Sequence, residues 1–76
     1  MKYFVIGFAS TSDAMAMEYF CKKNKVPGRL IANPKELSTS CGLAWKFEGD
    51  YKSKADLEDF LRVNNLAWEK MVLLDF

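Results

Sequence analysis

The order of apolar and polar segments predicts a ferredoxin-like α+β sandwich, with a four-stranded antiparallel sheet and two helices on one face. Runs rich in β-branched and aromatic residues alternate with two stretches of helical apolar spacing, in the order β-α-β-β-α-β. Right-handed crossovers around a central hairpin then give the strand order 4-1-3-2. The chain has 76 residues, which is enough for one small core, so we expect a single domain over residues 1–76.

The N-terminal third predicts a strand followed by a helix. Residues 2–8 are apolar after Lys2, which is typical of a central strand covered on both faces. Ser10 and Asp13 bound a cluster of N-cap candidates, ahead of a helix over about residues 13–24. The inner stripe of this helix is predicted to consist of Ala14, Met17, Phe20 and Cys21.

The middle of the chain predicts a hairpin with a long polar loop. Val26-Pro27-Gly28 is expected to end the first helix, with the glycine in a left-handed conformation. A short strand over residues 29–32, a polar loop over 33–40 and a strand over 42–48 follow. In the last of these, Leu43, Trp45 and Phe47 alternate with Ala44, Lys46 and Glu48.

The C-terminal third predicts a second helix and a fourth strand. Gly49-Asp50 forms a turn, and Ser53 caps a helix in which Asp56 takes the acidic position of a capping box. Its stripe is Leu57, Phe60 and Leu61. Asn64-Asn65 ends the helix because asparagine tolerates a left-handed conformation. Residues 66–74 are predicted to form the last strand.

The sheet is expected to leave apolar side chains on the face without helices. The alternation places Tyr3, Val5 and Gly7 opposite Phe4, Ile6 and Phe8, and places Trp68, Val72 and Leu74 opposite Met71 and Leu73. A contiguous exposed apolar patch usually marks an interface. We therefore predict a homodimer through the open face, with cover by the C-terminal segment or by strand twist as the alternative.

The composition excludes several classes of site. The chain contains no histidine, which rules out Ser-His-Asp and Cys-His catalytic pairs and zinc sites with histidine ligands. Two cysteines cannot form a four-ligand zinc site, so we predict neither a metal nor a cofactor. The sequence has no apolar run of membrane-spanning length and no signal peptide, which favours a cytoplasmic protein with reduced thiols.

An RNA-binding module is an alternative that the fold raises. RNA recognition motifs stack bases on aromatic residues of the first and third strands. Here the segment 41–48 fits their motif only at Gly42, Ala44 and Trp45, and the net charge of +1 opposes nucleic-acid binding. This alternative requires Trp45, together with Tyr3, to be exposed on the open face.

The unusual stretch is Ser38-Thr39-Ser40-Cys41-Gly42. Because strands 1 and 3 are central antiparallel neighbours, Cys41 should face the start of the first helix, near Ser10 and Thr11. That setting favours a thiolate, and Ser38, Thr39 and Ser40 would add hydroxyl donors, while Gly42 lets the backbone approach a cargo atom. The alternative interpretation is that Cys41 packs as a small hydrophobe and that the hydroxyl residues only satisfy a turn.

The same stretch carries a family resemblance. The run from Pro34 to Ala44, with its Ser-x-Ser-Cys-Gly core, resembles the hallmark of the selenium/sulfur carrier protein-like family. The resemblance covers roughly residues 3–48 and includes Ser10, Ala14 and Glu18 of the first strand–helix unit.

The resemblance implies that Cys41 holds sulfur or selenium as a persulfide or selenosulfide. Donor and acceptor proteins would be its partners, Ser38, Ser40 and Gly42 its supporting residues, and the chain a carrier rather than an enzyme. This reading expects Cys41 to be accessible and Cys21 to be inert. A ligand-sensing or interaction module that dimerises through the open sheet remains the alternative, and it does not depend on Cys41.

Overall fold

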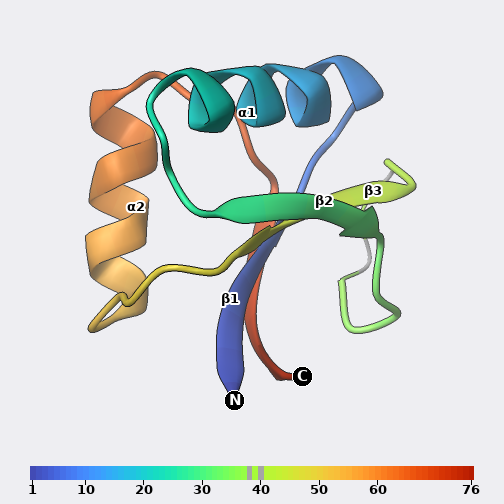
Figure 1. Ribbon diagram of the computed structural model, residues 1–76. Coiled ribbons are helices and arrows are strands. Elements are labelled where there is room, and N and C mark those ends of the chain that lie inside the picture. The colour runs from blue at the N-terminus through green and yellow to red at the C-terminus, as the bar shows by residue number, and fades with distance from the viewer. Residues whose placement is uncertain (38, 40) are drawn as a thin grey trace.

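The computed structural model describes residues 1–37, 39 and 41–76, and its six elements follow the predicted order (Figure 1). They are β1 (Lys2–Gly7), α1 (Thr11–Lys23), β2 (Gly28–Ala32), β3 (Leu43–Phe47), α2 (Lys54–Val63) and β4 (Lys70–Asp75). All neighbouring strands are antiparallel, in the order β2-β3-β1-β4. This is the predicted order 4-1-3-2 read from the other edge, so the ferredoxin-like fold is confirmed.

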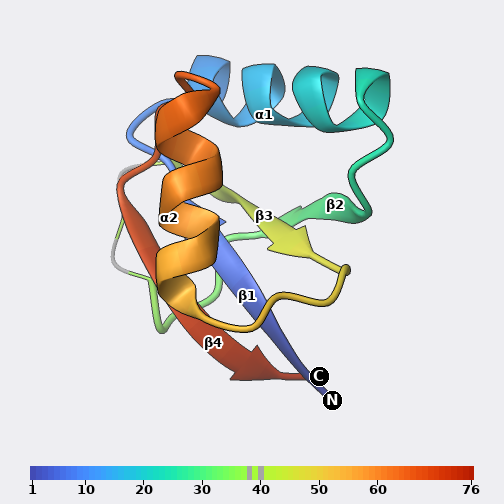
Figure 2. The same cartoon turned by 90° about the vertical axis from the view of Figure 1, so that its left-hand side faces the viewer.

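Both helices pack on one face of a strongly twisted sheet. Figures 1 and 2 show α1 running alongside β2, whereas α2 runs along the other half of the sheet. The buried residues between these layers come from alternate strand positions and from the inner stripe of each helix. They are Ile6, Phe8, Ala14, Met17, Cys21, Cys41, Trp45, Phe47, Leu57, Leu61 and Met71.

The helix starts follow the predicted capping. The side-chain oxygen of Ser10 accepts a hydrogen bond from the Asp13 N–H at 3.3 Å, so α1 begins two residues earlier than its predicted first residue. Ser53 accepts from the Asp56 N–H at 3.4 Å in the same way. Such caps satisfy backbone donors that the first turn of a helix leaves free.

The two helices end differently, and one prediction about them was wrong. Asn65, after α2, has φ 54°, as its predicted left-handed role requires. After α1 the left-handed residue is Lys25, with φ 57°, and not Gly28. The Val26 N–H donates to the Cys21 carbonyl at 2.8 Å, which closes the end of α1 around Lys25, before Gly28 is reached. Gly28 instead begins β2, where a Cβ atom would lie 2.6 Å from the Trp45 ring.

The fourth strand is shorter than the predicted 66–74, because β4 begins only at Lys70. The Leu66 N–H donates to the Leu61 carbonyl at 2.9 Å, which ties the start of this segment to the end of α2. Trp68 packs against the helix-side core, on the same side as Met71. The prediction that Trp68 shares a face with Val72 was therefore wrong, because strand alternation does not extend back to residue 68.

The face without helices is partly covered by the chain itself. Leu37, from the β2–β3 loop, is 2% exposed and forms a small buried cluster with Val5 and Ala44. At the other end of this face, the Lys46 Nζ lies 4.2 Å from the centre of the Phe76 ring. The C-terminal residue thus contributes cover, as one alternative predicted, but the contribution of Leu37 was not foreseen.

Candidate functional site

Cys41 lies where β1 ends and α1 begins. Its backbone N–H donates to the Phe8 carbonyl at 3.2 Å, which fixes the start of the β3 segment beside the end of β1. Its Sγ lies 3.8 Å from Oγ1 of Thr11, the first residue of α1, and either atom can be the donor. The Leu43 N–H donates to the same Sγ at 3.4 Å. The predicted approach of Cys41 to the first turn of α1 is confirmed.

The thiol is nevertheless covered. Cys41 is only 4% exposed and belongs to the helix-side core, together with Phe8 and Ala14. The expectation of an accessible thiol is wrong for this conformation, because the side chain points between the sheet and α1 rather than outward. A reagent can reach Sγ only after a local rearrangement.

The other residues predicted around the thiol have different partners. The Thr39 hydroxyl donates to the Cys41 carbonyl at 3.4 Å, not to its sulfur. The Ser10 hydroxyl caps α1, so of the two residues predicted at the helix start only Thr11 contacts Sγ. Ser38 and Ser40 lie outside the described residues.

Gly42 borders open space. The residue is exposed, and a Cβ atom built on it would meet no other atom within 4 Å. Nothing among the described residues therefore requires a glycine here for packing. The position that follows Cys41 in the sequence is therefore open to solvent.

Cys21 has a different environment, as predicted. It is fully buried on the inner stripe of α1, and its Sγ lies 3.6 Å from the Met17 Sδ. Burial raises the pKa of this thiol to about 11, against an ordinary value of 9.0. The neutral thiol is the stable form in an apolar environment, which makes Cys21 a poor nucleophile at neutral pH.

Two residues that organise the loop before Cys41 were missed from the sequence. Asn33 joins the two ends of the loop, because its backbone N–H donates to the Gly42 carbonyl at 3.0 Å and its side-chain amide donates to the Leu37 carbonyl at 3.1 Å. Leu37 anchors the loop in the open face of the sheet. The sequence did contain one indication of this anchor, since Leu37 is the single large apolar residue in an otherwise polar loop.

Two other kinds of site find no support. Trp45 is 1% exposed and lies on the helix side, so one of the two aromatic residues that the RNA-binding alternative requires on the open face is buried on the other face. Across residues 1–37, 39 and 41–76, no three cysteine or acidic side chains gather as metal ligands. In the same residues, no helix has the length and apolar character needed to cross a membrane.

Comparison with known proteins assigns the chain to a family. The model of the family described as "Putative Se/S carrier protein-like" matches residues 2–73. The chain belongs to this family, as the Ser-x-Ser-Cys-Gly motif predicted. No curated protein and no solved structure matches the chain.

Proposed function

We propose that this member of the family carries sulfur or selenium on the Cys41 thiol, as a persulfide or selenosulfide, and passes it to an acceptor protein. The observation that carries the proposal is the pair of polar contacts to one sulfur. The Leu43 N–H lies 3.4 Å from Sγ and the Thr11 hydroxyl 3.8 Å from it. The Sγ of Cys21 instead donates to the Met17 Sδ at 3.6 Å.

The proposed loading step needs no histidine. The Cys41 thiolate attacks the outer sulfur of a donor persulfide, and an S–S bond forms between them. The bond between the two donor sulfurs breaks, and the donor leaves as a thiolate with the electron pair of that bond. The proton of the donor persulfide stays on the transferred sulfur, so no external oxidant or reductant is consumed. A selenium donor would react in the same way and leave selenium on Sγ.

The supporting residues have separate parts in this proposal. The Leu43 N–H and the Thr11 hydroxyl can donate to a negatively charged sulfur. The open position at Gly42 gives room for the cargo or for a partner's donor group. Since Cys41 is 4% exposed, loading also requires a local opening of the segments that cover Sγ. Donor and acceptor proteins are the implied partners, and the reduced thiols fit a cytoplasmic location.

Loading with glutathione persulfide tests this function. The folded protein is treated with the reagent, and each cysteine peptide is analysed by mass spectrometry for the mass of one added sulfur. We expect the added sulfur on Cys41, unchanged loading in Cys21→Ala, and no loading in Cys41→Ser. Gly42→Val should reduce loading without a loss of stability, because its side chain would enter open space. An unloaded Cys41 in the folded wild-type protein would refute the carrier function.

A ligand-binding or interaction module is a second candidate, and the burial of Cys41 is the observation that favours it. A dimer of this kind would form through the partly buried Ile31, Val72 and Leu74 on the open face. It predicts a dimer by sedimentation analysis that is unchanged in Cys41→Ser. The carrier function does not require a dimer through the open face of the sheet.

A further inference from the structure

The segment that leads to Cys41 passes from the open face of the sheet to the helix side around the end of β1. Leu37 anchors this segment in the open face. Two residues later, the side chain of Thr39 lies against Gly7, the last residue of β1. The Cys41 N–H then donates to the Phe8 carbonyl, and the Cys41 side chain joins the helix-side core. The end of β1 is therefore enclosed between Thr39 and Cys41.

The contact between Gly7 and Thr39 leaves no room for a larger residue at position 7. A Cβ atom built on Gly7 would lie 2.7 Å from the Thr39 Cγ2, 3.0 Å from its Oγ1 and 3.3 Å from its Cβ. Non-bonded carbon atoms are most stable at roughly 3.5–4.0 Å, so a methyl group on Gly7 would displace Thr39. Rotation of the threonine side chain does not remove the clash. Two of the three positions on its Cβ face Gly7, and only one of the three substituents is hydrogen.

The backbone conformation does not require a glycine at residue 7. Gly7 does not have the positive φ that favours glycine, so other residues could adopt its backbone angles. A glycine inside a strand often marks a close approach by another part of the chain, which here is Thr39. Gly7 is also paired with Ala44 on β3 and with Lys70 on β4. Because the sheet holds Gly7 on both sides, an added methyl group would move Thr39 and not β1.

A movement of Thr39 would be transmitted to Cys41. The Thr39 hydroxyl donates to the Cys41 carbonyl at 3.4 Å, and the Cys41 N–H donates to the Phe8 carbonyl at 3.2 Å. These two hydrogen bonds link the side chain that rests on Gly7 to the backbone of the cysteine. The position of Thr39 therefore affects how firmly the Cys41 segment is held at the end of β1.

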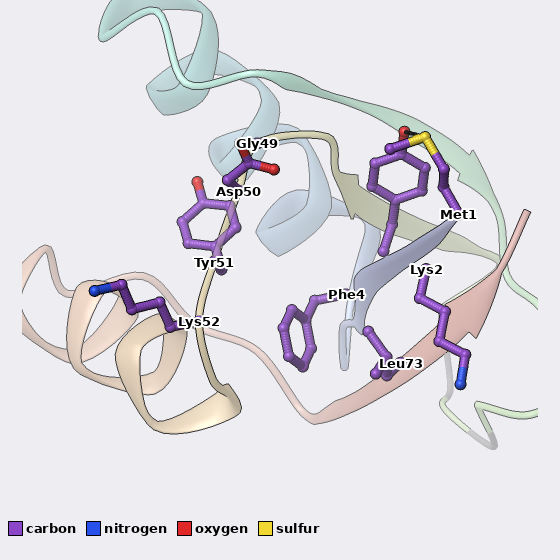
Figure 3. Close-up of a pocket in the computed structure, with 9 residues that line it drawn as sticks. Met1, Lys2, Phe4, Gly49, Asp50, Tyr51, Lys52 and Leu73 are labelled. Atoms are coloured by element: carbon purple, nitrogen blue, oxygen red, sulfur yellow. Dashed lines mark hydrogen bonds between the residues drawn. The ribbon is translucent and has the colours of Figure 1, made fainter.

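The pocket shown in Figure 3 does not reach the thiol. It is lined by residues 1–4, 49–52 and Leu73, at the other end of β1 from Cys41. Cys41 is 4% exposed, so access to its sulfur depends on the segments that cover it. The segment that contains Thr39 is joined directly to the cysteine, and its contact with Gly7 is therefore the one to test.

We propose that Gly7 is a positioning residue for the Cys41 thiol. The absence of a side chain on Gly7 gives Thr39 its place against β1, and this contact keeps the Cys41 segment closed. The strength of the contact sets how often the thiol is exposed to a sulfur or selenium donor. The inference rests on the proposed carrier function for what the exposed thiol does, whereas the closing contact itself does not depend on that function.

Gly7→Ala tests this role by adding one methyl group. The folded variant and the wild-type protein are treated with iodoacetamide, and peptide mass spectrometry gives the labelling rate of each cysteine. We expect the rate at Cys41 to rise roughly tenfold, which is the scale of an overpacking cost confined to the closed segment. The rate at Cys21 should stay unchanged, because the main core is not disturbed.

Removal of the Thr39 side chain supplies the matched control. Thr39→Ala lacks the two atoms nearest to Gly7, so the addition of Gly7→Ala to this variant should change the Cys41 rate by less than about twofold. Gly49→Ala, whose Cβ would lie 3.3 Å from the Tyr51 ring, should leave the rates at both cysteines unchanged.

Four results would overturn the proposal. Gly7→Ala could leave the Cys41 rate unchanged, raise the rates at both cysteines alike, fail to fold, or act equally with and without the Thr39 side chain. The carrier function fails separately, if the wild-type protein takes no sulfur from glutathione persulfide while Gly7→Ala still raises the alkylation of Cys41.

Discussion

The two cysteines of this chain are both buried, yet they lie in different surroundings. Cys21 belongs to the last turns of α1 and has a thioether neighbour inside the core. Cys41 touches the first turn of the same helix and has an N–H and a hydroxyl near its sulfur. Burial alone therefore does not show whether a cysteine is inert or reactive. The polarity of its neighbours and the packing of its own segment must be considered as well.

The packing around the two segments also differs. The side chains of both cysteines belong to the main core between the sheet and the helices, but Cys21 is held there by its place within α1. The loop that leads to Cys41 is anchored on the opposite face of the sheet by Leu37, in a cluster whose other buried members are Val5 and Ala44. A small satellite cluster gives less stabilisation than a main core, so the Cys41 segment is expected to open at a lower free-energy cost.

Leu37→Ala is expected to change the difference between the two cysteine segments more than any other variant proposed below. The removal of a buried leucine side chain should lower the free energy of unfolding by about 3 kcal/mol, measured by urea denaturation. It should also raise the rate of alkylation at Cys41 more than at Cys21. Val63→Ala, at a position that is mostly exposed, is the control and should change little. Equal increases at both cysteines would mean that Leu37 supports the whole fold and not the Cys41 segment.

Alkaline pH should reveal the Cys21 environment through stability. The pKa of Cys21 is raised to about 11 in the folded chain, whereas the ordinary value is 9.0. The folded state therefore favours the neutral thiol, and this contribution is complete below pH 9 and lost as the pH rises towards 11. The loss is at most about 2.7 kcal/mol, from two pKa units.

Cys21→Ala supplies the control for the alkaline measurement. The variant should lose less free energy of unfolding than the wild-type protein between pH 9 and 11, because it has no thiol to ionise at this position. Identical slopes for the two proteins in this pH range would contradict the assignment of Cys21 to an apolar environment.

Lys25→Gly should have the smallest effect and should act on the Cys21 end of α1 only. Lys25 has a positive φ of 57°, which glycine adopts without steric cost. We expect a stabilisation of about 0.5–1 kcal/mol and no change in Cys41 alkylation. Asn65→Gly at the end of α2 is the matched control and should gain less, since asparagine already tolerates this conformation. A faster reaction at Cys41 in Lys25→Gly would show that the two ends of α1 are coupled.

Much of the fold could be predicted from apolar periodicity and capping residues. The pattern of Leu43, Trp45 and Phe47 identified the strand face that the helices cover. Ser53 identified the start of α2, and the cap candidates from Ser10 to Asp13 located that of α1 to within two residues. The segment from Leu66 to Glu69 was wrongly assigned to the last strand. A short apolar run has the same sequence pattern in a strand as in an irregular segment that packs on the core. The contact that distinguishes them, from the Leu66 N–H to the end of α2, is tertiary.

The candidate site was predicted in part. Topology brought Cys41 to the start of α1, since antiparallel neighbours place the end of β1 beside the start of β3. The sequence left the burial of the thiol open between two interpretations, because it depends on how α1 packs against the Cys41 segment. The anchor Leu37 was missed for a related reason: a loop side chain has no periodicity that shows which face of the sheet it covers.

Alkylation of the folded protein by iodoacetamide measures directly whether Cys41 is more reactive than Cys21, because both thiols are compared in one sample. Peptide mass spectrometry would follow the labelling of Cys21 and Cys41 over time, at neutral pH and without denaturant. We expect Cys41 to react through local opening, at a rate well above that of Cys21, while the protein stays folded. If both cysteines react only as fast as the whole protein unfolds, Cys41 is a core residue and the carrier function is contradicted.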